Sequence, residues 1–199
     1  MTRKFFLKWF ILGIILRLLV IPITVHPDIR AFDLGGYLIS QKGLWLSFYD
    51  YLSTLPSGDP LLLSYKTDLF IYPPLSYLTP AVFMALLSPF YNFSFNNIFL
   101  STMWLTYGKA ELFQTLILLK IPYLALDLFL AYVLYLIFKG EKGKTAFKLW
   151  LLNPLSLYTT FAIGQIDIFP TLLTVAAILA VLRNKKLLAV ILLGIGGSF

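Results

Sequence analysis

Long apolar stretches separated by short polar breaks dominate the chain. Apolar residues prevail over segments 5–25, 112–138, 147–163 and 166–182, and another apolar stretch begins at 187 and runs to 199. A helix of about 20 apolar residues crosses the hydrocarbon core of a membrane. The pattern therefore predicts an all-α polytopic membrane protein with four complete transmembrane helices and the start of a fifth. Because 187–199 is too short to span, we expect the sequence to be the N-terminal part of a longer protein.

Segment 26–111 has a different pattern, rich in aromatic residues but repeatedly interrupted. Apolar residues recur there at helical spacing, with Gly43 between them, which is typical of an amphipathic helix lying in the membrane interface. Segment 75–87 is apolar as well, but thirteen residues give only about 20 Å of helix. We therefore predict one large outer loop with interfacial or re-entrant helices. The residues with helical spacing are Leu34, Tyr37, Leu38, Trp45, Phe48, Tyr49 and Leu52.

The distribution of charge predicts the orientation of these helices. Lys and Arg concentrate in cytoplasmic loops of membrane proteins. Three short segments, 3–8, 139–148 and 183–186, hold ten of the sixteen Lys and Arg residues and a single acid, Glu141, whereas acids outnumber bases in 26–111. We predict a cytoplasmic N-terminus, with 26–111 and the turn at 164–167 on the opposite face. The ten basic residues of these three segments are Arg3, Lys4, Lys8, Lys139, Lys142, Lys144, Lys148, Arg183, Lys185 and Lys186.

Composition narrows the class of protein further. The chain is 59% hydrophobic with a mean hydropathy of +0.85, so we expect a multi-pass protein of the cell membrane in a prokaryote or of the endoplasmic reticulum in a eukaryote. The net charge of +7 comes from residues beside apolar spans, which indicates membrane orientation and no nucleic-acid partner. The absence of cysteine and the single histidine exclude disulfides and argue against a zinc site.

The densest cluster of charge follows the first span, at residues 25–33. A carboxylate on the outer face, such as Asp28, is suited to accept a proton from an acceptor hydroxyl. Alternatively, Asp28 only caps a helix that begins near Pro27. Asp33 and Arg30 are candidates to support it. An irregular loop could bring Asp28 and Asp33 to one site, whereas a helix from Pro27 would place them on different faces.

Charged residues inside the second span and polar residues in the outward turn are further candidates. Lys120, near the outer surface, could reach a lipid-linked phosphate. Asp127 lies near mid-membrane, where we favour a structural pair with Arg17 of the first span. Gln165 and Asp167 lie in the outward turn, next to the Asn153-Pro154 break. They are candidates for binding substrate, although any such turn needs polar residues.

With these residues assembled, the chain resembles the polytopic glycosyltransferases of the C superfamily, in particular mannosyltransferases that use polyprenyl-phosphate-mannose, such as the glycosylphosphatidylinositol mannosyltransferase I type. The resemblance covers nearly the whole chain and rests on the order and spacing of several motifs. They are His26-Pro27-Asp28, Tyr72-Pro73-Pro74-Leu75, Lys120-Ile121-Pro122-Tyr123-Leu124-Ala125-Leu126-Asp127-Leu128, Trp150-Leu151-Leu152-Asn153-Pro154-Leu155 and Gly164-Gln165-Ile166-Asp167.

The resemblance implies transfer of a sugar, mannose by these parallels, from a polyprenyl-phosphate carrier to a lipid or glycan acceptor on the non-cytoplasmic face, with inversion. Asp28 would be the base, Asp33 or Arg30 its support, and Lys120, Gln165 and Asp167 would serve the donor side. Family members often have two acids at this position, whereas in this chain Pro27 and Ile29 flank the single Asp28. This departure argues against a divalent metal. Family members also continue through further spans, so we expect these 199 residues alone to be inactive.

Two other functions fit a membrane protein of this kind. A transporter or flippase-like carrier should concentrate its polar residues at mid-membrane on broken helices. In this chain most acids fall in 26–111 instead, which favours chemistry at the membrane surface. The third alternative is a non-catalytic membrane subunit.

Overall fold

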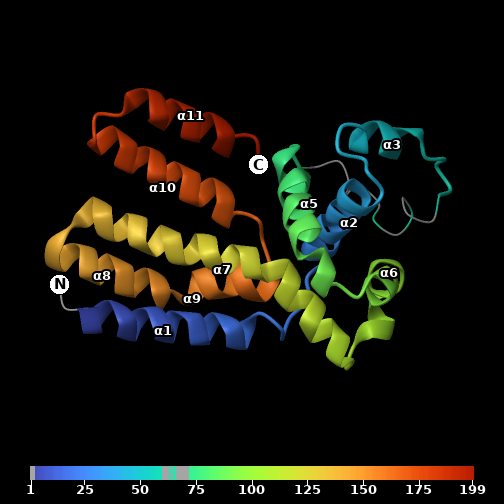
Figure 1. Cartoon of the computed structure of the whole chain (residues 1–199), viewed down its shortest axis with the longest axis horizontal. Helices are drawn as coiled ribbons and strands as arrows, with labels where there is room; N and C mark the ends of the chain where they lie inside the picture. The colour runs from blue at the N-terminus through green and yellow to red at the C-terminus, as the bar shows by residue number, and fades with distance from the viewer. Residues whose placement is uncertain (1–2, 60–62, 64, 66–71) are drawn as a thin grey trace. The chain divides into compact units, whose positions relative to one another are not determined.

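A computed structural model describes residues 3–59, 63, 65 and 72–199, and every regular element in that part of the chain is helical (Figure 1). The all-α class is therefore confirmed. Lys66 and Asp68, two of the charged residues of 26–111, lie outside the described residues. The chain divides into two compact units, which we describe separately. The first comprises Met1–Thr24 and Lys120–Phe199, and the second comprises Val25–Leu119.

The first unit consists of long apolar helices and the turns that join them. One helix of the described chain, α7, is long and apolar enough to cross a membrane. Its bounds extend the predicted span 112–138 by two residues at the start. The helices are α1 (Arg3–Val20), α7 (Ala110–Phe138, from Lys120 on), α8 (Gly140–Leu151), α9 (Pro154–Ser156), the π-helix η3 (Leu157–Ile163), α10 (Ile168–Leu182) and α11 (Lys186–Gly196).

The connection between α7 and α8 is a tight left-handed turn. Lys139 and Gly140 both have positive φ, at 53° and 50°. A Cβ at Gly143 would lie 2.7 Å from the backbone oxygen of Tyr135, so only glycine allows α8 to approach α7 this closely. As a result α8 begins at Gly140, well before the predicted start of the third span at 147.

The predicted third span is broken in the structure. The side chain of Asn153 accepts a hydrogen bond of 3.0 Å from the backbone N–H of Leu155, and Pro154 occupies the first helical position. Asn at a cap and Pro directly after it are the residues that start a new helix. The new helix widens into η3 and ends at Gly164, whose φ is 88°. π-Helices are rare in proteins, and those that occur are often found at functional sites.

The second unit is made of short helices. The predicted interfacial helix through Leu34–Leu52 is instead two helices, and Gly43 in the segment between them has a φ of 76°, which interrupts helical geometry. The bounds of α5 are those predicted from the apolar pattern. The helices are α2 (Pro27–Gln41), α3 (Phe48–Thr54), α5 (Leu75–Leu87), the 3₁₀ turn η1 (Ser88–Phe90), α6 (Phe93–Ser101) and the 3₁₀ turn η2 (Met103–Thr106).

Packing of α2 against α5 forms the core of this unit. Ile29, Phe32 and Tyr77 are at most 1% exposed. A Cβ at Gly35 would lie 2.5 Å from Cδ1 of Tyr77, so the absence of a side chain lets the two helices touch. The ring of Tyr77 packs against those of Phe32 and Phe48, with centroids 6.2 Å and 5.0 Å apart. Thus nine of the fifteen residues of α2 are buried within the unit.

The orientation can be tested by labelling single cysteines, which the cysteine-free sequence allows. We expect a cysteine at Ser57, which is exposed in the loop after α3, to react with a membrane-impermeant thiol reagent added outside. A cysteine at Lys142, which is exposed in α8, should react only after the membrane is permeabilised. Lys142 is preferable to Gly143, where a side chain would collide with α7. External labelling at Lys142 with protection at Ser57 would reverse the proposed orientation.

Candidate functional site

The charged stretch at residues 25–33, after α1, begins a helix. His26 is the N-cap of α2, and its Nδ1 accepts a hydrogen bond of 3.3 Å from the backbone N–H of Asp28. Pro27 occupies the first helical position, which its fixed φ favours. The carboxylate of Asp28 also lies 3.4 Å from the ring of His26, and a quarter of the Asp28 side chain is exposed. Asp28 therefore lies in the first turn of α2, where the helix dipole favours a negative charge.

Because α2 begins at Pro27, Asp28 and Asp33 do not share a site. Five residues along an α-helix rotate the direction of the side chain by about 140°. Asp28 is half-buried and reaches the surface, whereas Asp33 is fully buried. The irregular loop that could have joined the two carboxylates does not form, and a role for Asp33 in catalysis stays a prediction.

Asp33 and Asn96 form a buried polar pair between α2 and α6. Nδ2 of Asn96 donates to Oδ1 of Asp33 at 3.4 Å, and both side chains are 0% exposed. Burial raises the pKa of Asp33 to about 8, although the Asn96 hydrogen bond and the charge of Arg30 act in the opposite direction. Oδ2 of Asp33 and Oδ1 of Asn96 have no hydrogen-bond partner among the described residues. A proton on Asp33 shared with Asn96 would satisfy both oxygens.

Arg30 connects α2 to the C-terminal end of α6. Its guanidinium donates to the backbone oxygen of Leu100, with Nε at 3.1 Å, and the hydroxyl of Tyr65 donates to the same oxygen at 2.9 Å. The guanidinium also stacks on the ring of Tyr65, 4.4 Å from its centroid. Cations stabilise a helix C-terminus because the last carbonyls are unpaired. Much of the bonding capacity of Arg30 is thus used within the unit.

Lys120 is fully buried in the first unit and is surrounded by backbone oxygens. Its Nζ lies 3.1 Å and 2.9 Å from the oxygens of Ile21 and Thr24, which follow α1, and 2.8 Å and 3.0 Å from those of Phe161 and Ala162 in η3. A lysine ammonium has three N–H donors. These oxygens therefore occupy all of them, and binding a phosphate would require their release.

Arg17 and Asp127 form the buried ion pair that their positions in the sequence predicted. Nε and Nη2 of Arg17 lie 2.6 Å and 2.5 Å from Oδ2 of Asp127, and both side chains are 0% exposed. The other carboxylate oxygen accepts hydrogen bonds from the indole of Trp150 at 2.9 Å and the hydroxyl of Ser156 at 3.1 Å. Nη1 of Arg17 donates to the backbone oxygen of Leu151 at 2.8 Å. The pair thus connects α1, α7 and the broken helix.

A small polar pocket adjoins this network. Its cavity volume is about 170 Å³. Trp150 and Ser156, which donate hydrogen bonds to Asp127, also line this pocket. Asp167, one of the candidates in the turn at 164–167, lies exposed at this pocket, and Gln165 of the same turn is half-buried. The polar lining residues are Asn153, Ser156, Thr159, Thr160, Asp167 and Thr171.

Several residues of these sites carry no clear signal in the sequence. Asn96 is an amide within the apolar helix Phe93–Ser101, which is the one hint that a buried polar partner exists. Ser156 and Trp150 flank the Asn153-Pro154 break but look like ordinary helix residues. Among the described residues, no group of three or more His, Asp or Glu side chains converges to hold a metal ion.

The Arg17–Asp127 pair should make a large contribution to stability. Asp127→Asn leaves the buried guanidinium without a counter-charge, which costs about 3–5 kcal/mol in such pairs. We expect a strong loss of thermal stability in detergent. The double variant Arg17→Met with Asp127→Leu should recover most of it, because an apolar pair of similar size removes both buried charges. Asp167→Asn, at an exposed carboxylate, is the control. Equal stability of Asp127→Asn and wild type would contradict a structural pair.

Asp33 should make stability depend on pH. Its pKa is 3.8 when unfolded and about 8 when folded, so the folded state binds the proton more tightly. The resulting stabilisation is complete below pH 3.8 and is lost as the pH rises to about 8. Asp33→Asn should flatten this slope and should exceed wild type in stability above pH 8, as measured by thermal unfolding across pH. Asp50→Asn, which removes an exposed acid of the same unit, should keep the slope. If the stability of Asp33→Asn depended on pH as that of wild type does, the raised pKa assigned to Asp33 would be wrong.

Comparison of the chain with protein-family models, with curated proteins and with solved structures gave no match.

Proposed function

We propose that this chain forms part of a multi-pass membrane glycosyltransferase that takes a sugar, mannose by resemblance, from a polyprenyl-phosphate carrier. The observation that carries the proposal is the placement of Asp28. It lies in the first turn of α2, directly after α1, with its carboxylate partly exposed, while the neighbouring Asp33 is buried. Among the carboxylates of residues 25–33, Asp28 is the one that a substrate can reach.

The chemistry follows from that position. The oxygen of an acceptor hydroxyl attacks the anomeric carbon of the sugar as the bond from that carbon to the carrier phosphate breaks. The hydroxyl proton passes to Asp28, and the polyprenyl phosphate leaves with the electron pair. Attack from the side opposite the phosphate inverts the anomeric centre. A nearby carboxylate also stabilises the positive charge that develops on the sugar ring.

The donor-side residues have different roles in this proposal. Asp167 and Gln165 lie in the turn after η3, at or near the polar pocket, where hydroxyls of a sugar would find acceptors and donors. Lys120 holds the carbonyl oxygens of Phe161 and Ala162, just before that turn. We therefore assign Lys120 to positioning the turn, and direct contact with the carrier phosphate would require it to exchange these oxygens for phosphate.

A second candidate is a carrier for a lipid-linked or polar substrate. It is favoured by the polar pocket at the broken helix, because discontinuous helices with buried charges are typical of transport sites. The buried charges themselves do not favour a carrier, since Arg17 and Asp127 neutralise one another and bond to neighbouring helices. This ion pair explains the packing of the helices at least as well as it explains transport of a substrate.

Asp28→Asn separates catalysis from a structural role in the first turn of α2 and from transport. Asparagine keeps the shape of the side chain and suits a helix N-terminus, but it cannot accept the proton. The variant is made in the protein with all the spans that the resemblance implies. In membranes that contain the natural acceptors and radiolabelled polyprenyl-phosphate-mannose, we expect turnover per folded protein to fall roughly 10²–10⁴-fold. The yield of folded protein in detergent should be nearly unchanged. Asp50→Asn, at an exposed acid of α3, is the matched control and should keep full turnover.

Other results of this experiment would redirect the proposal. Turnover near wild type in Asp28→Asn would reduce Asp28 to a structural residue of the first turn. If no transfer occurs in wild-type membranes, but purified protein in liposomes moves the labelled lipid across the bilayer, the carrier function is the correct one.

A further inference from the structure

The first unit has an apolar groove that neither the ion pair nor the polar pocket uses. It lies between α1 and α7, with Phe147 of α8 beneath them, and its cavity volume is about 620 Å³. That is within the usual range for ligand pockets, about 300–1,000 Å³. Arg3 is the only charged residue of the lining. The residues facing the groove from α1 are Arg3, Phe6, Leu7 and Phe10, and those from α7 are Ala125, Leu128, Phe129 and Tyr132.

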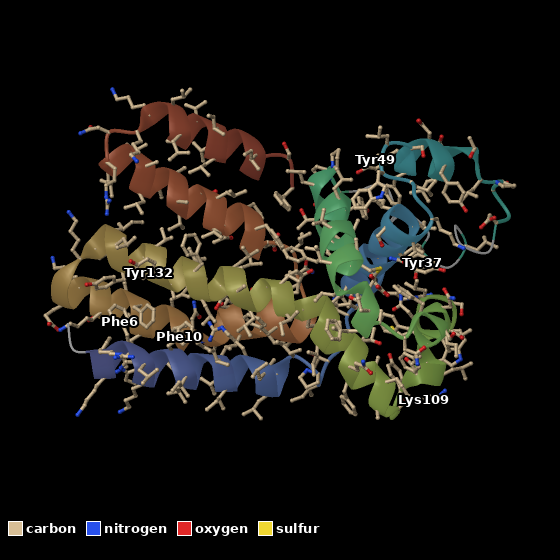
Figure 2. All side chains as sticks on the ribbon, in the orientation of Figure 1. Phe6, Phe10, Tyr37, Tyr49, Lys109 and Tyr132 are labelled. Atoms are coloured by element: carbon tan, nitrogen blue, oxygen red, sulfur yellow. The ribbon has the colours of Figure 1, made fainter. Side chains whose placement is uncertain are left out.

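The spacing of these residues shows the direction of the groove. Each helix contributes positions i, i+3, i+4 and i+7, which form one stripe along a helix. The groove therefore runs along the helices. In Figure 2, Phe6 and Phe10 point from α1 toward α7 and α8, and Tyr132 lies on α7 toward its C-terminal end. Phe6 packs edge-on against Tyr135 and Phe147, each with centroids 5.0 Å apart, and these rings form a firm wall.

On α1 the groove ends about halfway along the helix. One turn beyond Phe10, the same face reaches Gly13, where a Cβ would lie 2.9 Å from the side chain of Leu151. Arg17 then ties α1 to Asp127 of α7. From Arg3 to Gly13 is about 15 Å of helix. The hydrocarbon core of a bilayer is about 30 Å thick, so this length corresponds to one leaflet. A further transmembrane helix would instead need a surface over the full thickness.

The mouth of the groove lies where basic residues gather. Arg3 lines it, and Lys4, Lys139 and Lys142 are exposed on the same ends of α1, α7 and α8. Glu141 is the only acid of that region and is paired with Lys144. A groove that is apolar along its length and cationic at its mouth is complementary to a lipid with an anionic headgroup. Basic pockets on the cytoplasmic side of membrane proteins bind such lipids.

We propose that the groove between α1 and α7 binds one acyl chain of an anionic phospholipid of the cytoplasmic leaflet, with the lipid phosphate at Arg3. The proposal rests on the membrane orientation given above, but not on transferase activity. Leu7, Phe10, Phe129 and Tyr132 are each 39–55% exposed and would be covered by the chain.

The test compares lipid retention by purified protein after exchange into detergent containing phosphatidylglycerol or phosphatidylcholine, read by native mass spectrometry. Wild type should retain one phosphatidylglycerol in preference to phosphatidylcholine. Arg3→Gln should reduce that preference about fivefold, as expected for one cation near an anionic headgroup. Lys4→Gln is the matched control, because it loses the same charge on the neighbouring residue that does not line the groove. Ala125→Phe fills the groove from an exposed position and should abolish retention without lowering thermal stability.

Each alternative outcome overturns the proposal. Retention of lipid by Ala125→Phe equal to wild type would place the lipid elsewhere. Equal effects of Arg3→Gln and Lys4→Gln would show that the preference for phosphatidylglycerol arises from general surface charge and not from the groove. A wild-type dimer that Ala125→Phe converts to a monomer, with no bound lipid in either, would identify a second copy of the chain as the occupant. These readouts do not involve sugar transfer, so they stay informative if the proposed function fails.

Discussion

The buried ion pair between Arg17 and Asp127 is the interaction on which the first unit depends. Neither charge can remain unpaired in apolar surroundings, since each would cost several kcal/mol to bury alone. Each partner is also bonded to the broken helix, through Leu151 on one side and through Trp150 and Ser156 on the other. The pair therefore fixes the relative positions of α1, α7 and α8–α9, and with them the inner end of the groove and the wall of the polar pocket.

The break in the third predicted span follows from the same need to satisfy buried polar groups. Pro154 cannot continue the hydrogen bonds of α8, and Asn153 caps the new helix in its place. The carbonyl oxygens near the end of η3 receive the ammonium of Lys120. Irregular backbone is tolerated inside a membrane protein where other groups of the protein satisfy it. The polar pocket is a consequence of this break, since it gathers hydroxyl and amide groups around a helix that has lost its regularity.

The start of α2 gives the charged residues of 25–33 different surroundings. Because a helix begins at Pro27, the side chain of Asp28 points away from those of Arg30 and Asp33, which lie three residues apart on the same face of α2. Asp28 reaches the surface, Arg30 binds the end of α6, and Asp33 is buried against Asn96. The proposal for Asp28 as a base depends on this separation. A buried acid with a raised pKa and an exposed acid in the first turn of a helix are suited to different tasks.

The amino-acid sequence alone determined the helical class, the bounds of α5, the end of α7 at Phe138 and the partnership of Arg17 with Asp127. These follow from local periodicity and from the cost of a lone charge in an apolar helix. The partners of Lys120, the pairing of Asp33 with Asn96, the division at Gly43 and the groove at Arg3 were decided by the tertiary structure. The oxygens that hold Lys120 belong to the backbone, which every residue carries, so no side-chain pattern marks them. Asp33 meets Asn96 across 63 positions of sequence, and only the packing of α2 with α6 brings the two together.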